Sequence, residues 1–283
     1  MTFPSPHLGD SAGLPLTLVV TTMNNAQTLA RCLDSVPPTV DAVVLDSGSS
    51  DGSRDIARAR GARVYTESFR GYGPQKAAAI ARAHSPWVLL LDADEWLSQA
   101  SAVALRELFA AGEPGCDGYT LARREWLFWQ FQHPATRMNR YLRLFRSDRS
   151  SMSAASIHAA PVVAGEVGRL PGWLMHDGER DIGTKVDKVN AYATGTAADR
   201  LRRGTGWVRT RMVLYPPVFF LRSWLFKRQF LNGWAGFIAS VTGAYYVFLK
   251  YAKVYEARRQ PAAVTETERA KPRLEAKSSD VAA

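Results

Sequence analysis

Short apolar segments alternate with segments of helical periodicity over the first hundred residues, and this alternation constrains the fold more than any other feature. Branched and apolar residues predict strands at Leu16–Thr22, Asp41–Asp46 and Ala62–Glu67, and a fourth strand in WVLLLDAD, from Trp87. After a GYGPQ turn, KAAAIARAH predicts a helix that stops before Pro86. Strands and helices that alternate through short links indicate an α/β fold with a doubly wound, mostly parallel sheet.

Charge and cysteine content narrow the class of protein. The chain has a net charge of +10, which favours a polyanionic partner such as a phosphorylated substrate, nucleic acid or an anionic membrane. Its two cysteines do not suggest a disulfide framework, and they fit a reducing cytosol. The N-terminal MTFPSPHLGDSAG lacks the basic region of a signal peptide.

Polar residues follow three of the predicted strands, and ligands of open α/β sheets bind at this carboxyl edge. They are Thr21, Thr22 and Asn24 after the first strand, Asp46, Ser47 and Asp51 after the second, and Asp92, Asp94 and Glu95 after the fourth. Asp92 and Asp94 form a D-x-D pair, whose oxygens suit a Mg²⁺ or Mn²⁺ ion that also bridges substrate phosphates. The alternative for this pair is the acidic first turn of a helix.

Four stretches in this order and spacing resemble family 2 glycosyltransferases of the GT-A fold: LVVTTMNNAQTLARCLDSV, VVLDSGSSDGS, GYGPQKAAAIARA and WVLLLDADE. VLDSGSSDGSRDIAR, followed by GYGPQK and LDADE, is most similar to the branch that adds a sugar, often glucose, to the inner core of lipopolysaccharide. The resemblance implies inverting transfer of a sugar, with glucose expected, from a UDP-sugar donor to a lipid-linked saccharide acceptor. Mn²⁺ or Mg²⁺ is the implied cofactor.

The resemblance also implies roles for single residues. Thr21 and Asn24 would line the nucleotide site, Asp46 would approach the uracil with Ser47 beside it, and Lys76 would lie near the diphosphate. Asp92 would face the ribose and the metal, and Asp94 would bind the metal directly. Many family members carry a second Asp where this chain has Ser47. Each position has an alternative: Asp46 and Asp51 shape a turn or cap a helix, and Lys76 is a solvated helix residue.

The catalytic base is the point at which the chain departs from its relatives. Inverting transfer needs a base, usually a carboxylate, for the acceptor hydroxyl. The related branch has His-Glu where this chain has His158 followed by Ala159. Three interpretations stay open: His158 itself is the base, an acid of HDGERD (Asp177, Glu179 or Asp181) replaces it, or transfer is weak or lost. The alternative for His158 and His176 is a structural, hydrogen-bonded histidine.

Arg143 in RYLRLFR has two interpretations as well. It contacts phosphate or an anionic acceptor, or it is one of several solvated arginines on a strand edge.

The C-terminal part is basic and aromatic. Eight bases and no acid lie from Arg200 to Arg228, and residues 229–249 carry no charge. Polar residues and glycines dilute the uncharged run, so a buried or interfacial helix is favoured over a membrane span. We therefore expect a catalytic domain at 1–184 (nucleotide-sugar half about 15–100, acceptor half 101–184), a helical extension at 185–256 that associates with an anionic membrane, and a flexible tail at 257–283. The expected location is the cytoplasmic face of the inner membrane, where the protein is peripheral.

Other functions are weaker matches. A non-catalytic protein that binds a sugar nucleotide or a membrane is the first alternative, because the base is missing at Ala159. A D-x-D phosphatase is the second, but that class carries its motif on the first strand. The chain has no G-x-G-x-x-G after a strand and no P-loop, which argues against a dehydrogenase. Nucleic acid is not an expected partner, because bulky aliphatic residues interrupt the bases and no nucleic-acid motif is present.

Overall fold

The computed structural model describes residues 13–153, 160–178 and 180–260, and its internal contacts divide the chain into two units. The N-terminal unit ends at Asp181 and the C-terminal unit begins at Ile182, close to the predicted boundary after residue 184. Each unit is described by itself below.

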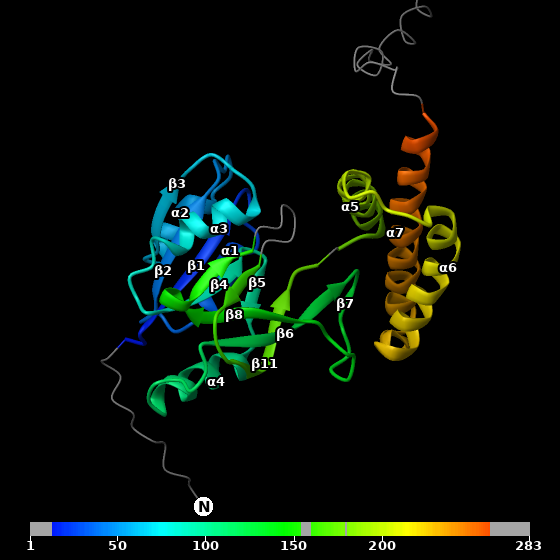
Figure 1. Cartoon of the computed structure of the whole chain (residues 1–283). Helices are drawn as coiled ribbons and strands as arrows, with labels where there is room; N and C mark the ends of the chain where they lie inside the picture. The colour runs from blue at the N-terminus through cyan, green and yellow to red at the C-terminus, as the bar shows by residue number, and fades with distance from the viewer. Residues whose placement is uncertain (1–12, 154–159, 179, 261–283) are drawn as a thin grey trace, which may run out of the picture. The chain divides into compact units, whose positions relative to one another are not determined.

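The N-terminal unit is built on a nine-stranded sheet in the order β3-β2-β1-β4-β8-β6-β11-β5, with β7 paired to β6 (Figure 1). The strands are β1 (Leu16–Thr22), β2 (Asp41–Asp46), β3 (Arg63–Thr66), β4 (Trp87–Asp92), β5 (Glu95–Leu97), β6 (Gly118–Leu127), β7 (Gln130–Phe131), β8 (Arg140–Arg146) and β11 (Val167–His176). β9 (Ser150–Met152) and β10 (Pro161–Val163) form a separate antiparallel pair.

The first four strands pair in parallel, as the alternation of strands and helices predicts. β1 pairs in parallel with both β2 and β4, and β2 pairs in parallel with β3. β8 is antiparallel to β4 and β6, whereas β6 and β11 are parallel. The sheet is therefore mixed but mostly parallel, and the α/β fold predicted from the sequence is confirmed.

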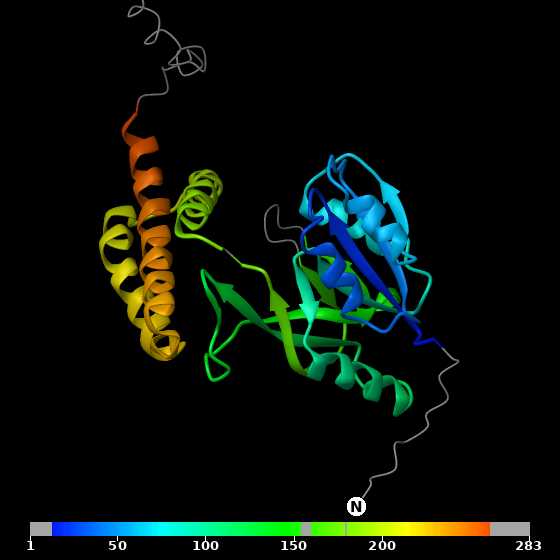
Figure 2. The same cartoon turned by 180° about the vertical axis from the view of Figure 1, so that it is seen from behind.

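Helices cover both faces of this sheet (Figures 1 and 2). They are α1 (Leu29–Asp34), α2 (Ser53–Ala59), α3 (Tyr72–Ile80) and α4 (Gln99–Ala110). Residues of α1, α2 and α4 share one hydrophobic cluster with Leu16, Leu18 and Val20 of β1, whereas Ala79 of α3 packs with Val19 on the other face. The alternation of side chains along β1 thus places one set of core residues on each face.

The prediction for α3 was wrong at both ends. The GYGPQ segment is not a separate turn, because α3 begins at Tyr72 and Gly71, with φ of 102°, directly precedes it. The helix ends at Ile80, before the predicted stop near Pro86. A proline is tolerated in the first helical turn, where its missing N–H would have had no helical partner.

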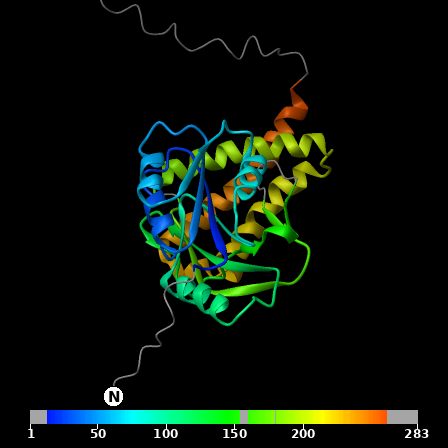
Figure 3. The same cartoon turned by 90° about the vertical axis from the view of Figure 1, so that its left-hand side faces the viewer.

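In its described residues, 182–260, the C-terminal unit has three α-helices, two of which pack against the third (Figure 3). α7 (Gly233–Arg259) packs against both α5 (Ile182–Arg202) and α6 (Val208–Leu221). A π-helical turn at Arg222–Phe226 and a 3₁₀ turn at Gln229–Asn232 connect α6 to α7. α7 continues to Arg259, so the first residues of the expected tail are helical.

Candidate functional site

The register of the parallel strands brings the three predicted polar strand ends to one edge of the sheet. Thr22 of β1 lies opposite Asp46 of β2, and Thr21 lies opposite Asp92 of β4. Asp94 follows in a two-residue turn between β4 and β5. The edge therefore contains the predicted nucleotide and metal residues of all three strands.

Hydrogen bonds join the loops that follow β1 and β2. Asn24 has a left-handed backbone, with φ of 56°, and its N–H donates to Ser49 Oγ at 2.8 Å. Its side-chain Oδ1 accepts the N–H of Ser50 at 2.8 Å. Asp51 accepts the N–H of Ala26 at 3.0 Å, and a hydrogen bond from the Ser53 hydroxyl lowers the pKa of this aspartate. Asn24 and Asp51 thus hold the two loops together, which pre-organises the edge.

Asp46 is fully buried and shapes the loop after β2. Its Oδ2 accepts the N–H groups of Gly48 and Ser49, both at 2.9 Å, and its Oδ1 accepts the Ser49 hydroxyl. Ser47 is half-buried, and its N–H donates to the carbonyl of Thr22 at 2.9 Å. The side chain of Asp46 therefore has the turn-forming contacts of the alternative interpretation, while its approach to a uracil stays a prediction.

Asp92 lies between two buried cations. Lys76 Nζ of α3 is 2.5 Å from Asp92 Oδ1, and Arg143 Nη2 of β8 is 3.0 Å from Oδ2. Burial raises the pKa of Asp92, but Arg143 and Lys76 outweigh it and hold this pKa well below its ordinary value. Lys76 is only 8% exposed, so the alternative of a solvated helix residue is wrong.

Glu95 explains part of the acidic cluster in LLLDADE as an internal ion pair. Its fully buried carboxylate accepts Arg143 Nη2 at 2.7 Å and Arg123 Nη1 at 3.3 Å through Oε1, and the Asp92 N–H at 3.1 Å through Oε2. Arg143 is buried on a strand between β4 and β6, so its interpretation as a solvated edge arginine is wrong. Burial lowers the pKa of Arg143, but Glu95 and Asp92 outweigh this and raise it.

Asp94, whose side chain is 38% exposed, pairs with a histidine. His176, the last residue of β11, places Nε2 3.4 Å from Asp94 Oδ2 and joins Nδ1 to Glu125 of β6. Burial lowers the pKa of His176, but hydrogen bonds with Asp94 and Glu125 raise it to about 10. His176 is thus a hydrogen-bonded histidine within the site. Glu125 was not among the predicted site residues, although it alternates with Arg123 along β6.

The base candidates are only partly described. His158 and Glu179 lie outside the described residues. The N–H of Asp177 donates to the carbonyl of Asp94 at 2.9 Å, so Asp177 directly neighbours the D-x-D turn. Its carboxylate pairs with Arg180 at 2.5 Å. Asp181 directly precedes α5.

The carboxylates of the D-x-D turn fit a divalent ion whose remaining ligands are oxygens of the substrate and of water. Within the described ranges, no group of three or more His, Cys, Asp and Glu side chains is arranged to hold a metal alone. A Mg²⁺ or Mn²⁺ ion bound with a diphosphate needs only one or two carboxylates, because phosphate and water oxygens supply the rest. Asp94 is partly exposed, so its carboxylate is accessible to such an ion.

Comparison with known proteins identifies the family of this chain. The family described as "Glycosyl transferase family 2" matches residues 17–161, just over half of the chain, and includes β2, β3, β4 and all of β1 but its first residue. The chain belongs to glycosyl transferase family 2. It is 32% identical to the lipopolysaccharide core biosynthesis glycosyltransferase LpsC of Rhizobium meliloti, over 86% of this chain and 93% of that protein.

Two further similarities extend over most of the chain. An uncharacterised glycosyltransferase of Rickettsia typhi is 29% identical over 84% of this chain and 85% of that protein. The mannosyltransferase PcManGT of Pyrobaculum calidifontis, solved in complex with GDP-Man and Mn²⁺, has a TM-score of 0.49 and 13% identity over 88% of this chain and 89% of that one.

Proposed function

We propose that this family 2 glycosyltransferase moves a sugar, with glucose expected, from a UDP-sugar to a lipid-linked or lipopolysaccharide-core acceptor, with inversion and with Mn²⁺ or Mg²⁺. The observation that carries the proposal is the partly exposed Asp94 beside the paired carboxylate of Asp92, at the edge where three strands end. The similarity to LpsC supports the acceptor class. A lipopolysaccharide acceptor requires a Gram-negative bacterium.

The chain's own residues would bind and orient the donor. Lys76 is held 2.5 Å from Asp92, so a positive charge lies at the sheet edge where the diphosphate is expected. Asp94 would hold the divalent ion directly, with Asp92 facing it, and the ion would neutralise charge on the leaving diphosphate when bound. Glu125 keeps the His176 ring in place, and Arg143 bonds to Glu95 and helps to hold the pKa of Asp92 low. The acceptor hydroxyl would transfer its proton to Asp177 or His158.

The donor site is tested by thermal stability with Mn²⁺ and a panel of UDP-sugars. A ligand at a hundredfold excess over its dissociation constant adds about 2.7 kcal/mol of stability. We expect one UDP-sugar to stabilise the wild type only with metal and Asp94→Asn not to respond. Asp148→Asn is the matched control, because antiparallel β8 carries Asp148 to the opposite end of β4. The donor site is wrong if no nucleotide shifts the wild type, and phosphate release without a nucleotide would then favour the phosphatase.

The base is tested by separating turnover from donor binding. Removal of a general base lowers kcat by about 10²–10⁴-fold, with donor binding retained. We expect this result for Asp177→Asn, because Asp177 neighbours Asp94. The same loss in His158→Gln, with Asp177→Asn active, would assign the role to His158 instead. Donor binding by a wild type that transfers no sugar would support the non-catalytic alternative.

Peripheral attachment to the cytoplasmic face of the inner membrane completes the proposal. No described helix has the length and apolarity that a membrane crossing requires. On α7, however, large apolar side chains are exposed at spacings of three and four residues: Trp234, Phe237, Val241, Tyr245 and Phe248. The chain contains no acid from Arg200 to Tyr255. An apolar stripe within a basic segment suits an anionic bilayer, where each base contributes about 1 kcal/mol near the surface.

A further inference from the structure

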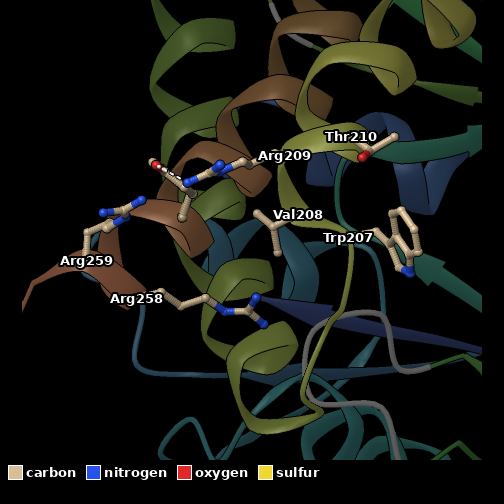
Figure 4. Close-up of a pocket in the computed structure, with 7 residues that line it drawn as sticks. Trp207, Val208, Arg209, Thr210, Arg258 and Arg259 are labelled. Atoms are coloured by element: carbon tan, nitrogen blue, oxygen red, sulfur yellow. Dashed lines mark hydrogen bonds between the residues drawn. The ribbon is translucent and has the colours of Figure 1, made fainter.

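A second polar site lies within the C-terminal unit, where α6 begins and α7 ends. A cavity of about 400 Å³ is present there (Figure 4). It is lined by Trp207, Val208, Arg209, Thr210, Tyr255, Arg258 and Arg259. Three of these seven residues are arginines, and none is acidic. The cavity is formed entirely by this unit and shares no residue with the glycosyltransferase site.

The three arginines of this cavity have no carboxylate partner in the described part of the chain. Arg209 donates to the Tyr255 hydroxyl at 3.4 Å, and Arg258 donates to the carbonyl of Thr205. The guanidinium carbons of Arg209 and Arg259 lie 5.5 Å and 5.4 Å from the centre of the Tyr255 ring. Two cations are thus held at one aromatic ring without an internal counter-charge, in contrast to the paired arginines of the sheet.

The position of Arg209 is the feature that ordinary helix stability does not explain. Arg258 and Arg259 lie in the last turn of α7, where bases interact favourably with the negative end of the helix. Arg209 lies in the first turn of α6, at the positive end, where a base is unfavourable. No acidic residue is present in that turn, and Trp207 makes no side-chain capping hydrogen bond. The cavity therefore gathers positive charge from both helices.

We propose that this cavity binds a phosphate group. Guanidinium groups match the geometry of phosphate oxygens through paired N–H donors, and the uncapped first turn of α6 adds backbone N–H groups. The phosphate belongs either to a soluble phosphate compound or to a phospholipid headgroup. Trp207, which is 79% exposed beside the arginines, would contact the rest of either molecule. This inference does not depend on the proposed function.

The test compares two variants that remove equal charge from the full-length protein. Arg209→Gln/Arg259→Gln alters the cavity and keeps Arg258, which bonds to Thr205. Arg203→Gln/Arg222→Gln is the control, because both arginines are exposed and neither lines the cavity. One arm measures thermal stability against inorganic phosphate at constant ionic strength with a metal chelator. The other measures binding to phosphatidylcholine vesicles with and without phosphatidic acid. Circular dichroism of both variants checks that each is folded.

The outcomes separate the two sources of phosphate. If the ligand is a soluble phosphate, inorganic phosphate stabilises the wild type and the control, and the cavity variant binds it about tenfold more weakly, as expected for the loss of charge-assisted hydrogen bonds. If it is a headgroup, the cavity variant loses about tenfold in affinity for phosphatidic acid vesicles relative to the control. The proposal is overturned if the two variants behave alike in both arms. Equal stabilisation of all three proteins would place the phosphate elsewhere.

Discussion

The sheet edge of the N-terminal unit and the cavity of the C-terminal unit differ in how their positive charges are compensated. At the sheet edge, Lys76, Arg123 and Arg143 are each within 3.3 Å of a carboxylate oxygen. At the cavity of the C-terminal unit, Arg209 and Arg259 contact the ring of Tyr255 and, among the residues that the structure describes, no carboxylate. A buried charge is costly unless a partner within the fold compensates it, whereas water stabilises an exposed charge and leaves it accessible to an external ligand. Unpaired arginines therefore indicate an external ligand more strongly than paired ones do.

Apolar side chains show the same difference. Leu18 and Leu91 of the sheet are fully buried in the core of the N-terminal unit. Trp234 of α7 is 75% exposed and Trp207 before α6 is 79% exposed. Isolated exposed apolar residues are common, but a regular stripe on one helix indicates an interaction surface. If this difference holds, substitutions in the ion pairs of the sheet should lower stability, and substitutions of exposed side chains on α7 should lower binding instead.

The largest effect is expected for Arg143→Met. This change removes the shared partner of Asp92 and Glu95, and among the described residues it leaves the fully buried Glu95 with Arg123 as its remaining cation. Breaking a buried ion pair from one side costs about 3–5 kcal/mol. Urea unfolding at pH 7 measures the loss, with Arg60→Met as control. Arg60 pairs with the exposed Asp34 at 2.7 Å, a surface pair that contributes at most about 1 kcal/mol. Similar losses of unfolding free energy in the two variants would mean that the buried ion pair contributes no more than the surface pair.

A smaller, pH-dependent effect is expected for His176→Gln in the presence of a metal chelator. Because the folded pKa of His176 is raised from 6.5 to about 10, its protonated form stabilises the fold. That contribution is fully present below pH 6.5 and is lost as the pH rises through 10. We expect the variant to be roughly 2 kcal/mol less stable at pH 6, which is less than the full pKa shift implies because solvent screens the charges. This deficit should vanish near pH 10.

Urea unfolding of both proteins at pH 6, 8 and 10 measures this difference. A deficit that does not change with pH would mean that His176 stabilises the fold through packing rather than through its charge.

The sequence predicts the parallel strands well because their signals are local. β1 and β2 have the predicted bounds, since each apolar run ends in polar residues at the sheet edge. The ion pairs around Asp92 and Asp94 were not predicted, because Arg143, Glu125 and His176 come from strands far apart in the chain. The register opposes His176 to both Glu125 and Glu95, and no local pattern specifies that register. Charged residues that alternate within β6 were the available signal, because alternate residues share one face of a strand.

The smallest effect on stability is expected in α7, where exposure and burial alternate along one helix. Trp234→Ser/Phe248→Ser removes two exposed side chains, so we expect the free energy of unfolding to change by at most about 0.5 kcal/mol. Affinity for vesicles with phosphatidylglycerol should fall by at least about tenfold, since even one large apolar side chain contributes roughly 1.5–3 kcal/mol when buried.

Val247→Ala is the matched control, because Val247 is 5% exposed in the core of the same unit. It should lower stability by about 2 kcal/mol and leave vesicle binding unchanged. If the Trp234 and Phe248 variant instead unfolds more easily and still binds vesicles, these side chains pack within the protein. The apolar stripe of α7 would then stabilise the fold of the protein and would not be a membrane-binding surface.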